Sequence, residues 1–389
     1  MRAAGSALVH AGRSHRAHVA SALAARYGAR AVVLTDSGTS ALVMALRVTA
    51  HEGGTVAFPA YCCIDLTAAA IRARVQVRLY DLDPTTLSPD LESVERVLAR
   101  GVDAIVVAHL YGYPADVASV SVLAERAGVH VIEDAAQGSG GTLDGKVLGA
   151  FGPLTVLSFG RGKGVTGGGG GALLATRPEW ATRVSALQPT LDHGGAGWRE
   201  VVAAGAQWVF GRPSLYGIPA SIPALRLGEM VYHPAHEPRA MSIAAAAIVR
   251  DAIAGADAEV ARRQRRAREL AASIGDANGL RVVTPIARGR SGHLRLPVID
   301  FAGRESDPRF GILRGYPRTL AEQEELRPCL CEGEIGPRGA ALLGRSLFTV
   351  PTHGLVSGRD VAGVHAWCRA LGARYGPGRV AAEGELNHA

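Results

Sequence analysis

The sequence predicts an α/β protein, with a mainly parallel sheet covered by helices on both faces and a smaller α+β domain after it. Between Ala31 and Ala175, short apolar runs of strand length alternate with segments whose apolar residues repeat at helical spacing. Such alternation is typical of parallel sheets in three-layer αβα folds. After residue 240 the pattern changes to one long helix, a few strand-like runs and a last helix.

The apolar runs in the first half of the chain are the predicted strands of the large sheet. Most are followed by turn residues, and helical patterns such as Ser40–Val48 and Ala115–Gly128 lie between them. Because ligands of open α/β sheets bind at the carboxyl ends of strands, side chains that follow these runs are the first candidates for a site. The runs are Ala31–Leu34, Thr55–Phe58, Gln76–Tyr80, Ala104–Ala108, His130–Glu133, Thr155–Ser158 and Ala172–Ala175.

A segment rich in Trp, Pro and Gly, residues 194–238, interrupts this alternation. We therefore predict a large domain over residues 1–240, which includes this atypical segment, and a small C-terminal domain over residues 241–389. In the small domain, the basic stretch Arg262–Arg266 is interpreted as a solvated face of a long helix. The elements expected there are helices over Met241–Ile274 and Gly358–Tyr375, strands near Arg281–Val283 and Leu294–Phe301, and a frayed tail over the last dozen residues.

The composition argues against several classes of protein. Of the 389 residues, 48% are hydrophobic and 20% are charged, which is typical of a globular protein. Neither an apolar run of about 18 residues nor the apolar core of a signal peptide is found, so we expect a cytoplasmic protein without a membrane span. The net charge of +7 is scattered, which argues against nucleic-acid binding and suits an anionic small substrate. The five cysteines lack the spacing of a zinc site, and no metal is predicted.

Lysine is almost absent from the sequence. Of the 42 basic residues, only Lys146 and Lys163 are lysines, so arginine is used wherever a plain positive charge suffices. A guanidinium group cannot form an imine, because it stays protonated and its nitrogens are delocalised. A lysine kept in this background therefore suggests a chemical role. For Lys146, in the turn Asp144-Gly145-Lys146, survival through sequence drift is explanation enough.

A first candidate site follows the strand Ala31–Leu34. Here Gly38, Thr39 and Ser40 open the next helix, where backbone N–H groups and hydroxyls can cradle a phosphate. The alternative is an ordinary N-cap, for which Ser and Thr are equally suited.

A second candidate is Asp134, which ends the buried strand-like run that starts at His130. An aspartate at this point can pair with a protonated pyridine nitrogen and keep an aromatic cofactor ring electron-withdrawing. The alternative is that it only caps the following helix.

The third candidate is Lys163, which lies in a glycine-dense loop after the strand Thr155–Ser158. Glycine lets the backbone approach a ligand closely, and a lysine amine can hold a carbonyl cofactor as a Schiff base. A nucleotide P-loop needs Gly in place of Leu157 and Ser or Thr in place of Gly164, and a Rossmann site needs a glycine triplet after the first strand, so both interpretations fail. The three candidates together suit a phosphorylated aromatic aldehyde, whereas Lys163 alone could also be a surface charge.

Short motifs along the chain add to these candidates. They are Pro59-Ala-Tyr61, Asp81-Leu-Asp83, His109–Asp116, Glu133–Gln137, Ser158 with Lys163 five residues later, Gly170-Gly171, Gly315-Tyr-Pro317 and Leu347–Leu355. With them, the sequence resembles the DegT/StrS family of sugar aminotransferases, which are fold type I enzymes dependent on pyridoxal 5'-phosphate (PLP). The resemblance covers residues 31–175 and returns in the small domain.

The resemblance implies a role for each candidate residue. Lys163 would hold PLP as a Schiff base, Asp134 would bind the pyridine nitrogen, and Gln137 would lie against the ring face or the phenolic oxygen. The residues implied to bind the phosphate are Gly38, Thr39, Ser40 and Ser158. Members of the family are homodimers that share active-site residues, and most transfer an amino group from glutamate to a keto sugar carried on a nucleotide.

The chain departs from the family pattern at a few positions. Cys63 stands where the family usually has an aromatic ring over the cofactor, and Gly164 where Asn follows the lysine. Before the long helix, the usual Asn-aromatic-Arg-Met reads Pro238-Arg-Ala-Met241. Transamination is the first interpretation of the reaction. One alternative is a PLP-dependent dehydratase, a class that typically lacks the lysine. The other is a PLP-binding pathway protein without turnover.

A final expectation concerns residues 203–225, which contain Trp208, Phe210 and several prolines without a clear helical or strand period. We interpret this segment as packing against a partner subunit, or as a docking face for an acceptor with an apolar portion, such as a lipid-linked or carrier-bound ketone.

Overall fold

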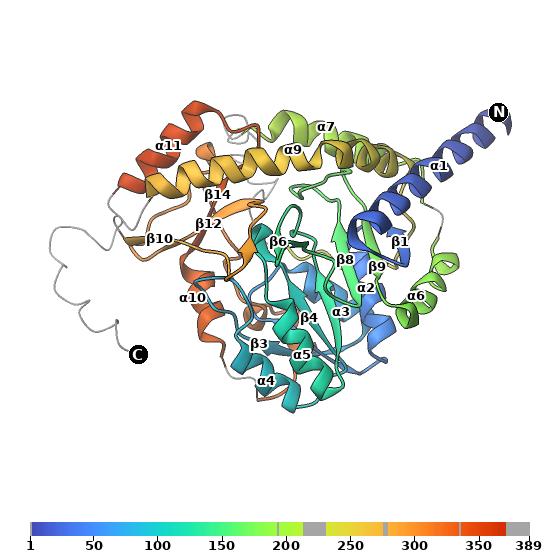
Figure 1. The fold of residues 1–389 in the computed structure, drawn as a ribbon, viewed down its shortest axis with the longest axis horizontal. Coiled ribbons are helices and arrows are strands. Elements are labelled where there is room, and N and C mark those ends of the chain that lie inside the picture. The colour runs from blue at the N-terminus through green and yellow to red at the C-terminus, as the bar shows by residue number, and fades with distance from the viewer. Residues whose placement is uncertain (1, 193, 213–230, 275–278, 334–335, 371–389) are drawn as a thin grey trace.

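The computed structural model describes residues 2–192, 194–212, 231–274, 279–333 and 336–370. A central sheet of seven strands forms the large part of the molecule, and a four-stranded sheet lies to one side of it (Figure 1). The long helix α9 (Ile243–Ile274) extends across both parts (Figure 1). Among the described residues, no helix is both long and apolar enough to cross a membrane.

The central sheet has the strand order β1-β9-β8-β5-β4-β2-β3. β9 runs antiparallel to β1 and β8, and the other neighbouring pairs are parallel, which confirms the predicted mainly parallel sheet. Each predicted run coincides with an observed strand to within one residue at either end. The strands are β1 (Ala31–Thr35), β2 (Thr55–Pro59), β3 (Gln76–Tyr80), β4 (Ala104–Ala108), β5 (His130–Asp134), β8 (Leu154–Ser158) and β9 (Gly171–Ala175).

Alternate residues of these strands enter different cores. In β9, Leu173 packs in the core that contains α2 and α3, whereas Leu174 packs in the core that contains α1 and α9. Because side chains alternate across a strand, the sheet is covered by helices on both faces, as the sequence predicts. The helices of this part are α2 (Gly38–Thr49), α3 (Asp65–Ala73), α4 (Leu91–Ala99), α5 (Val117–Ala127) and α6 (Pro178–Ser185).

The N-terminal helix α1 (Arg2–Tyr27) is not among the predicted elements. It packs along α9, where Arg16 Nε donates a hydrogen bond to the backbone oxygen of Met241 at 2.7 Å, and Arg26 pairs with Asp257 at 3.0 Å. The start of the chain is therefore attached to the first helix of the C-terminal part.

Helix α7 (Trp198–Phe210) corrects one expectation. The predicted lack of helical order in residues 203–225 is wrong for 203–210, which form the second half of this helix. The apolar residues of this helix lie on an exposed side. The sequence therefore lacks the usual pattern of a surface helix, in which the apolar residues mark the buried face. Residues 213–225 of the same segment lie outside the described residues.

The C-terminal part contains an antiparallel sheet of order β10-β12-β14-β13, covered by α9 and α11. The predicted helix from Gly358 is confirmed as far as Arg369, and its last residues and the predicted tail fall outside the described part of the chain. The elements are β10 (Leu280–Val282), β12 (Arg295–Asp300), β13 (Leu313–Arg314), α10 (Arg338–Ser346), β14 (Leu347–Pro351) and α11 (Gly358–Arg369).

The two parts are closely joined. β11 (Gly289–Arg290) pairs with β6 (Thr142–Leu143), which also pairs with β7 (Lys146–Val147) in a small sheet of its own. Leu320 and Leu347 from the C-terminal part are buried in the core of the large sheet. The division into domains at residues 1–240 and 241–389 therefore stays a prediction.

Candidate active site

The carboxyl ends of β5 and β8 bring the predicted residues to one edge of the sheet. Asp134 is the last residue of β5 and Ser158 the last of β8, and these strands are parallel neighbours. Lys163 lies in the loop between β8 and β9. The sheet thus places an acid, a hydroxyl and an amine where ligands of open α/β sheets bind.

Gly38 opens α2 directly beside Ser158. A Cβ atom on Gly38 would lie 2.6 Å from the Cβ of Ser158, so a larger residue would fill the space between them. Ser37 caps α2, since its Oγ accepts a hydrogen bond from the backbone N–H of Ser40 at 3.0 Å and lies 3.0 Å from the Ser40 Oγ. The Ser40 hydroxyl is therefore buried within the cap, whereas Thr39 is half-buried. The helix N-terminus, with its free N–H groups, can attract an anion here.

Asp134 is buried, and Lys163 lies close enough to act on it electrostatically. Its Oδ1 accepts a hydrogen bond from the backbone N–H of Ala136 at 2.9 Å. Burial raises the pKa of the Asp134 carboxyl, and the Ala136 N–H and the charge of Lys163 offset this only in part. A further cationic group at this point would stabilise the charged carboxylate.

The loop that carries Lys163 is confined by its neighbours. A Cβ on Gly164 would lie 2.2 Å from the Cβ of Ser139, and a Cβ on Gly167 would lie 2.7 Å from a methyl group of Val249 on α9. Only glycine lets the backbone pass here, and the Lys163 side chain is half-buried. The glycine-dense sequence thus reflects close packing around the lysine.

The side-chain amide of Gln137 is held at both ends. Its Oε1 accepts a hydrogen bond from the backbone N–H of Tyr111 at 2.8 Å, and its Nε2 donates to the Tyr316 hydroxyl at 2.7 Å. The Tyr316 ring stacks on the Tyr111 ring, with 5.8 Å between centroids, and lies 5.3 Å from the Tyr61 ring. Through Tyr316, the Gly315-Tyr-Pro317 motif of the C-terminal part reaches the candidate site.

Cys63 is half-buried near the same residues. Its Sγ donates a hydrogen bond to Asp65 Oδ2 at 3.2 Å. Burial, together with the negative charge of Asp65, raises the pKa of the Cys63 thiol far above its usual value, although the charge of Lys163 opposes this. The thiol is therefore neutral.

Glu133 anchors the strand end below the site. Its buried carboxylate accepts hydrogen bonds from His109 Nε2 at 2.9 Å and from the backbone N–H groups of Gly149, Phe151 and Gly152 at 2.6 to 2.7 Å. These interactions fix the strand from which Asp134 projects.

The sequence does not single out Arg263, which the structure places against the Lys163 loop. The basic stretch Arg262–Arg266 is mostly solvated as predicted, but the Arg263 side chain is only 7% exposed. Its guanidinium lies beside Gly164. The available signal is position, because Arg263 precedes Ala267 and Leu270 by the four- and seven-residue spacing of one buried helix face.

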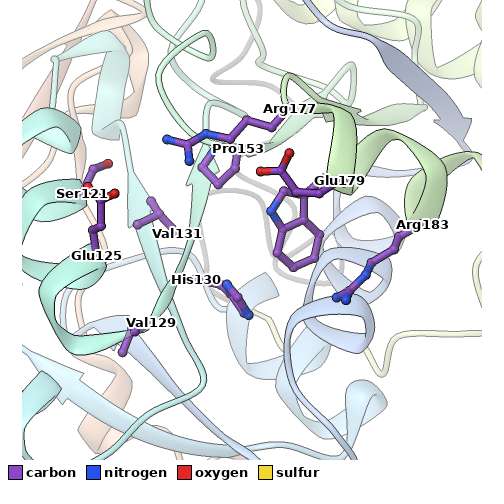
Figure 2. Close-up of a pocket in the computed structure, with 11 residues that line it drawn as sticks. Ser121, Glu125, Val129, His130, Val131, Pro153, Arg177, Glu179 and Arg183 are labelled. Atoms are coloured by element: carbon purple, nitrogen blue, oxygen red, sulfur yellow. The ribbon is translucent and has the colours of Figure 1, made fainter.

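A separate cavity of about 390 Å³ opens around the start of β5 (Figure 2). The ring of His130 meets that of Trp180 edge-on at 4.9 Å, and the Arg183 guanidinium lies 5.0 Å from the Trp180 ring. The residues that line this cavity include none of the predicted site residues. It opens at the opposite end of β5 from Asp134, so it is distinct from the candidate site.

Comparison with known proteins gives the family. Residues 3–300 match the model of the DegT/DnrJ/EryC1/StrS aminotransferase family, a stretch that includes Asp134 and Lys163. The chain belongs to this family. The resemblance inferred from the motifs is thereby confirmed.

Curated aminotransferases match parts of the chain. The L-glutamine:2-deoxy-scyllo-inosose aminotransferase of Streptomyces kanamyceticus is 32% identical over 40% of this chain and 37% of its own length. The dTDP-3-amino-3,4,6-trideoxy-alpha-D-glucose transaminase of Streptomyces venezuelae is 37% identical over 39% of this chain and 41% of its own length. The matches thus span about two fifths of these relatives.

Solved structures of aminotransferases match nearly the whole chain. An aminotransferase of this family from Brucella abortus has a TM-score of 0.71 at 22% identity, covering 95% of this chain and 94% of that one. The aminotransferase TlmJ from Streptoalloteichus hindustanus has a TM-score of 0.70 at 22% identity, covering 93% and 95%. At this level of identity the likeness shows the fold, which is the predicted one.

Proposed function

We propose that this chain is a PLP-dependent aminotransferase that moves an amino group from glutamate to a keto sugar carried on a nucleotide, in the biosynthesis of a glycan or natural product. The observation that carries the proposal is the position of the half-buried Lys163 near the buried carboxyl of Asp134, at neighbouring strand ends. The other lysine, Lys146, is exposed in a hairpin. Family membership supports the class of reaction.

The residues present fit PLP at each of its anchoring groups. A phosphate suits the N-terminus of α2, where Gly38 leaves a space beside Ser158 that a Cβ would fill. A protonated pyridine nitrogen would stabilise the charged form of Asp134, whose pKa burial raises. Gln137 would lie against the ring or its phenolic oxygen, and Thr39 and Ser40 complete the phosphate-binding end of the helix. Cys63 would occupy the ring-facing position.

The proposed mechanism assigns a task to each of the two main residues. When bound, PLP supplies an electron sink for the carbon from which the proton is removed. Lys163 would hold the cofactor through its side-chain amine, which the amino donor would then free to move the proton of the substrate carbon. Asp134 would face the ring nitrogen and keep it protonated.

The names of the relatives support the substrate class. One acts with L-glutamine on 2-deoxy-scyllo-inosose, and another is a transaminase of a dTDP-linked sugar. Glutamine therefore joins glutamate as a candidate donor. A lipid-linked or carrier-bound ketone is the second candidate acceptor, because α7 exposes Trp198 and Trp208 at 69% and 66% of their surface.

For the whole protein we propose a homodimer with shared active sites in the cytoplasm. The exposed apolar side of α7 is the proposed interface or, alternatively, the docking face for an apolar acceptor. The described part of this face comprises Trp198, Val201, Val202, Trp208, Val209 and Phe210.

The test replaces each lysine by arginine. Lys163→Arg keeps the charge and removes the imine, so the purified variant should lose the absorbance of lysine-bound PLP and all transfer activity. Lys146→Arg is the matched control and should retain both. Borohydride reduction of the wild type followed by peptide mass spectrometry should locate the cofactor on Lys163. A reducible imine or turnover that persists in Lys163→Arg would refute the assignment, and a yellow protein that no amino acid bleaches would indicate PLP binding without transfer.

A further inference from the structure

The guanidinium of Arg263 is buried without a complete set of partners. Its side chain is 7% exposed, and neither Nε nor Nη1 has a hydrogen-bond partner among the described residues. The nearest carboxylate is that of Glu259, whose Oε1 lies 3.5 Å from Nε. Glu259 is already engaged, because it accepts hydrogen bonds from the backbone N–H of Gly354 at 3.0 Å and from Arg262 Nε at 2.9 Å. A buried cation with unused donors is destabilising unless another acceptor completes it.

The unused donors of Arg263 lie beside the lysine of the proposed active site. Nη1 is 3.3 Å from the position that a Cβ on Gly164 would take, and Gly164 directly follows Lys163. The same helix touches the turn after β5, where a Cβ on Gly140 would meet Val260 at 2.2 Å. The packing of α9 therefore holds Arg263 against the Lys163 loop.

His353 is a second polar group without a complete set of partners, and it directly precedes Gly354, whose N–H donates to the same Glu259 oxygen that Arg263 faces. Burial lowers its pKa to about 4, and the positive charges of Arg295 and Arg263 act in the same direction. Its imidazole is therefore neutral at neutral pH, and its Nδ1 has no hydrogen-bond partner among the described residues. In the tautomer protonated at Nδ1, this ring donates one more hydrogen bond.

We propose that Arg263 binds a carboxylate of the amino donor, with His353 as a further donor of a hydrogen bond. This inference rests on the proposed aminotransferase function and names the residue that selects an amino acid as its first substrate. The planar guanidinium matches a carboxylate with two parallel hydrogen bonds, and the interaction would satisfy the buried donors.

Geometry favours the amino donor over the acceptor as the source of the anion. The α-carboxylate of an amino acid is bonded to the carbon that carries the reacting amine, so it must lie within a few bonds of the Lys163 side chain. The diphosphate of a nucleotide sugar is separated from the reacting carbonyl by the sugar ring. An anion site one residue from Lys163 therefore suits the carboxylate.

The test compares Arg263→Gln and Arg263→Lys with the control Arg265→Gln, which changes an exposed arginine on the same helix. In holoenzyme without acceptor, the glutamate or glutamine concentration that half-saturates amination of the cofactor should rise about 10- to 100-fold in Arg263→Gln. Arg263→Lys should fall between this variant and the wild type, because it keeps the charge and loses the paired donors. Arg265→Gln should behave as the wild type.

A readout without turnover uses glutarate, which has the carboxylates and lacks the amine. Glutarate should raise the melting temperature of the wild type and of Arg265→Gln, and should have no effect on Arg263→Gln. The inference would be overturned if both Arg263 variants kept the half-saturating donor concentration of the wild type and its rise in melting temperature with glutarate. It would also be overturned if the variants bound UDP or dTDP more weakly while the half-saturating donor concentration stayed unaltered. If no amino acid aminates the cofactor of the wild type, the proposed function fails. The effect of glutarate on the melting temperature then still decides whether Arg263 binds carboxylates.

Discussion

Glu133 and Asp134 are adjacent carboxylates at the end of β5 with opposite shifts in pKa. Burial alone would raise the pKa of Glu133, but the hydrogen bond from His109 and those from the amides of Gly152 and Gly149 bring it below its usual value. For Asp134, the Ala136 N–H and the charge of Lys163 compensate for burial only in part, and its pKa is raised. Because successive side chains of a strand point to opposite faces, one carboxylate secures the fold and its neighbour stays available to a ligand.

Asp134→Asn tests the proposed role of this residue in the reaction. The amide keeps the acceptor for the Ala136 N–H, so the fold should be nearly unaffected. The proton-transfer step should slow by orders of magnitude, because an unpaired pyridine nitrogen is a poor electron sink. Stopped-flow measurement of cofactor amination checks this, and equal rates for variant and wild type would leave Asp134 only as the acceptor that caps the turn after β5.

Cys63→Phe tests whether Cys63 occupies the ring-facing position. A phenyl ring stacked on the cofactor should be tolerated and should tighten PLP binding by about 1 kcal/mol, whereas Cys63→Ser should leave it unchanged. Equilibrium dialysis of PLP measures the difference. Release of the cofactor by Cys63→Phe would mean that other side chains, such as the Tyr316 ring, fill this space.

Individual residues were predictable where their type was unusual. Lys163 stands out because lysine is scarce in the chain, and Asp134 because it ends an apolar strand. Arg263 is one arginine among several in Arg262–Arg266, and only its helical spacing to Ala267 and Leu270 distinguishes it in the sequence from its solvated neighbours. The contact between Gln137 and Tyr316 joins residues far apart in sequence, which no local pattern contains.

At the scale of elements, α7 covers the Lys163 loop. The Thr166 hydroxyl lies 3.2 Å from Gln207 Oε1, and a Cβ on Gly168 would lie 2.1 Å from the backbone oxygen of Glu200. Its other side exposes Trp208 and Phe210 at 66% and 41% of their surface. Helix α7 therefore lies between the candidate site and the partner subunit or acceptor that is proposed to bind its apolar side.

Replacing Trp208 and Phe210 together by Ser tests this apolar side. We expect the double variant to become monomeric by light scattering, because the removed side chains would be buried between subunits. The control is Val122→Ser, which removes an apolar residue of 49% exposure on α5. An intact dimer with a raised KM for the acceptor alone would assign the face to docking, and an intact dimer with unchanged kinetics would contradict both roles.

At the scale of the whole molecule, the strands were predictable because each is a short apolar run between turn residues. The strand order was not, since it depends on contacts such as that of β1 with β9, whose residues lie far apart in sequence. Nor was α1, which packs along α9, a helix more than 200 residues later in the chain. The proposed domain division remains untested by this arrangement.

Glu133→Gln should destabilise the entire fold. The carboxylate binds His109 and three backbone N–H groups, so loss of its charge should lower the free energy of unfolding by about 2 to 4 kcal/mol. Urea unfolding at neutral pH measures this. Glu95→Gln, at an exposed position on α4, is the control and should change stability by less than about 0.5 kcal/mol.

The same carboxylate predicts a pH dependence. The pKa of Glu133 is lower in the folded state than its unfolded value of about 4.3, so its contribution is fully present above that value and is lost as the pH falls through the folded pKa. Between about pH 5 and pH 3 the wild type should therefore lose stability more steeply than Glu133→Gln. Parallel curves for the two proteins would show that Glu133 is not ionised in the fold.

The exposed hairpin of β6 and β7 has a practical consequence for chemical labelling. Lys146 lies there with its ammonium 4.8 Å from the centre of the Phe151 ring, and Lys163 is the other side-chain amine of the chain. If Lys163 holds PLP as proposed, its amine is blocked, and an acylating dye would find one lysine to modify, at the rim of the small sheet. A fluorophore or surface tether could thus be attached at a single defined lysine without altering the sequence.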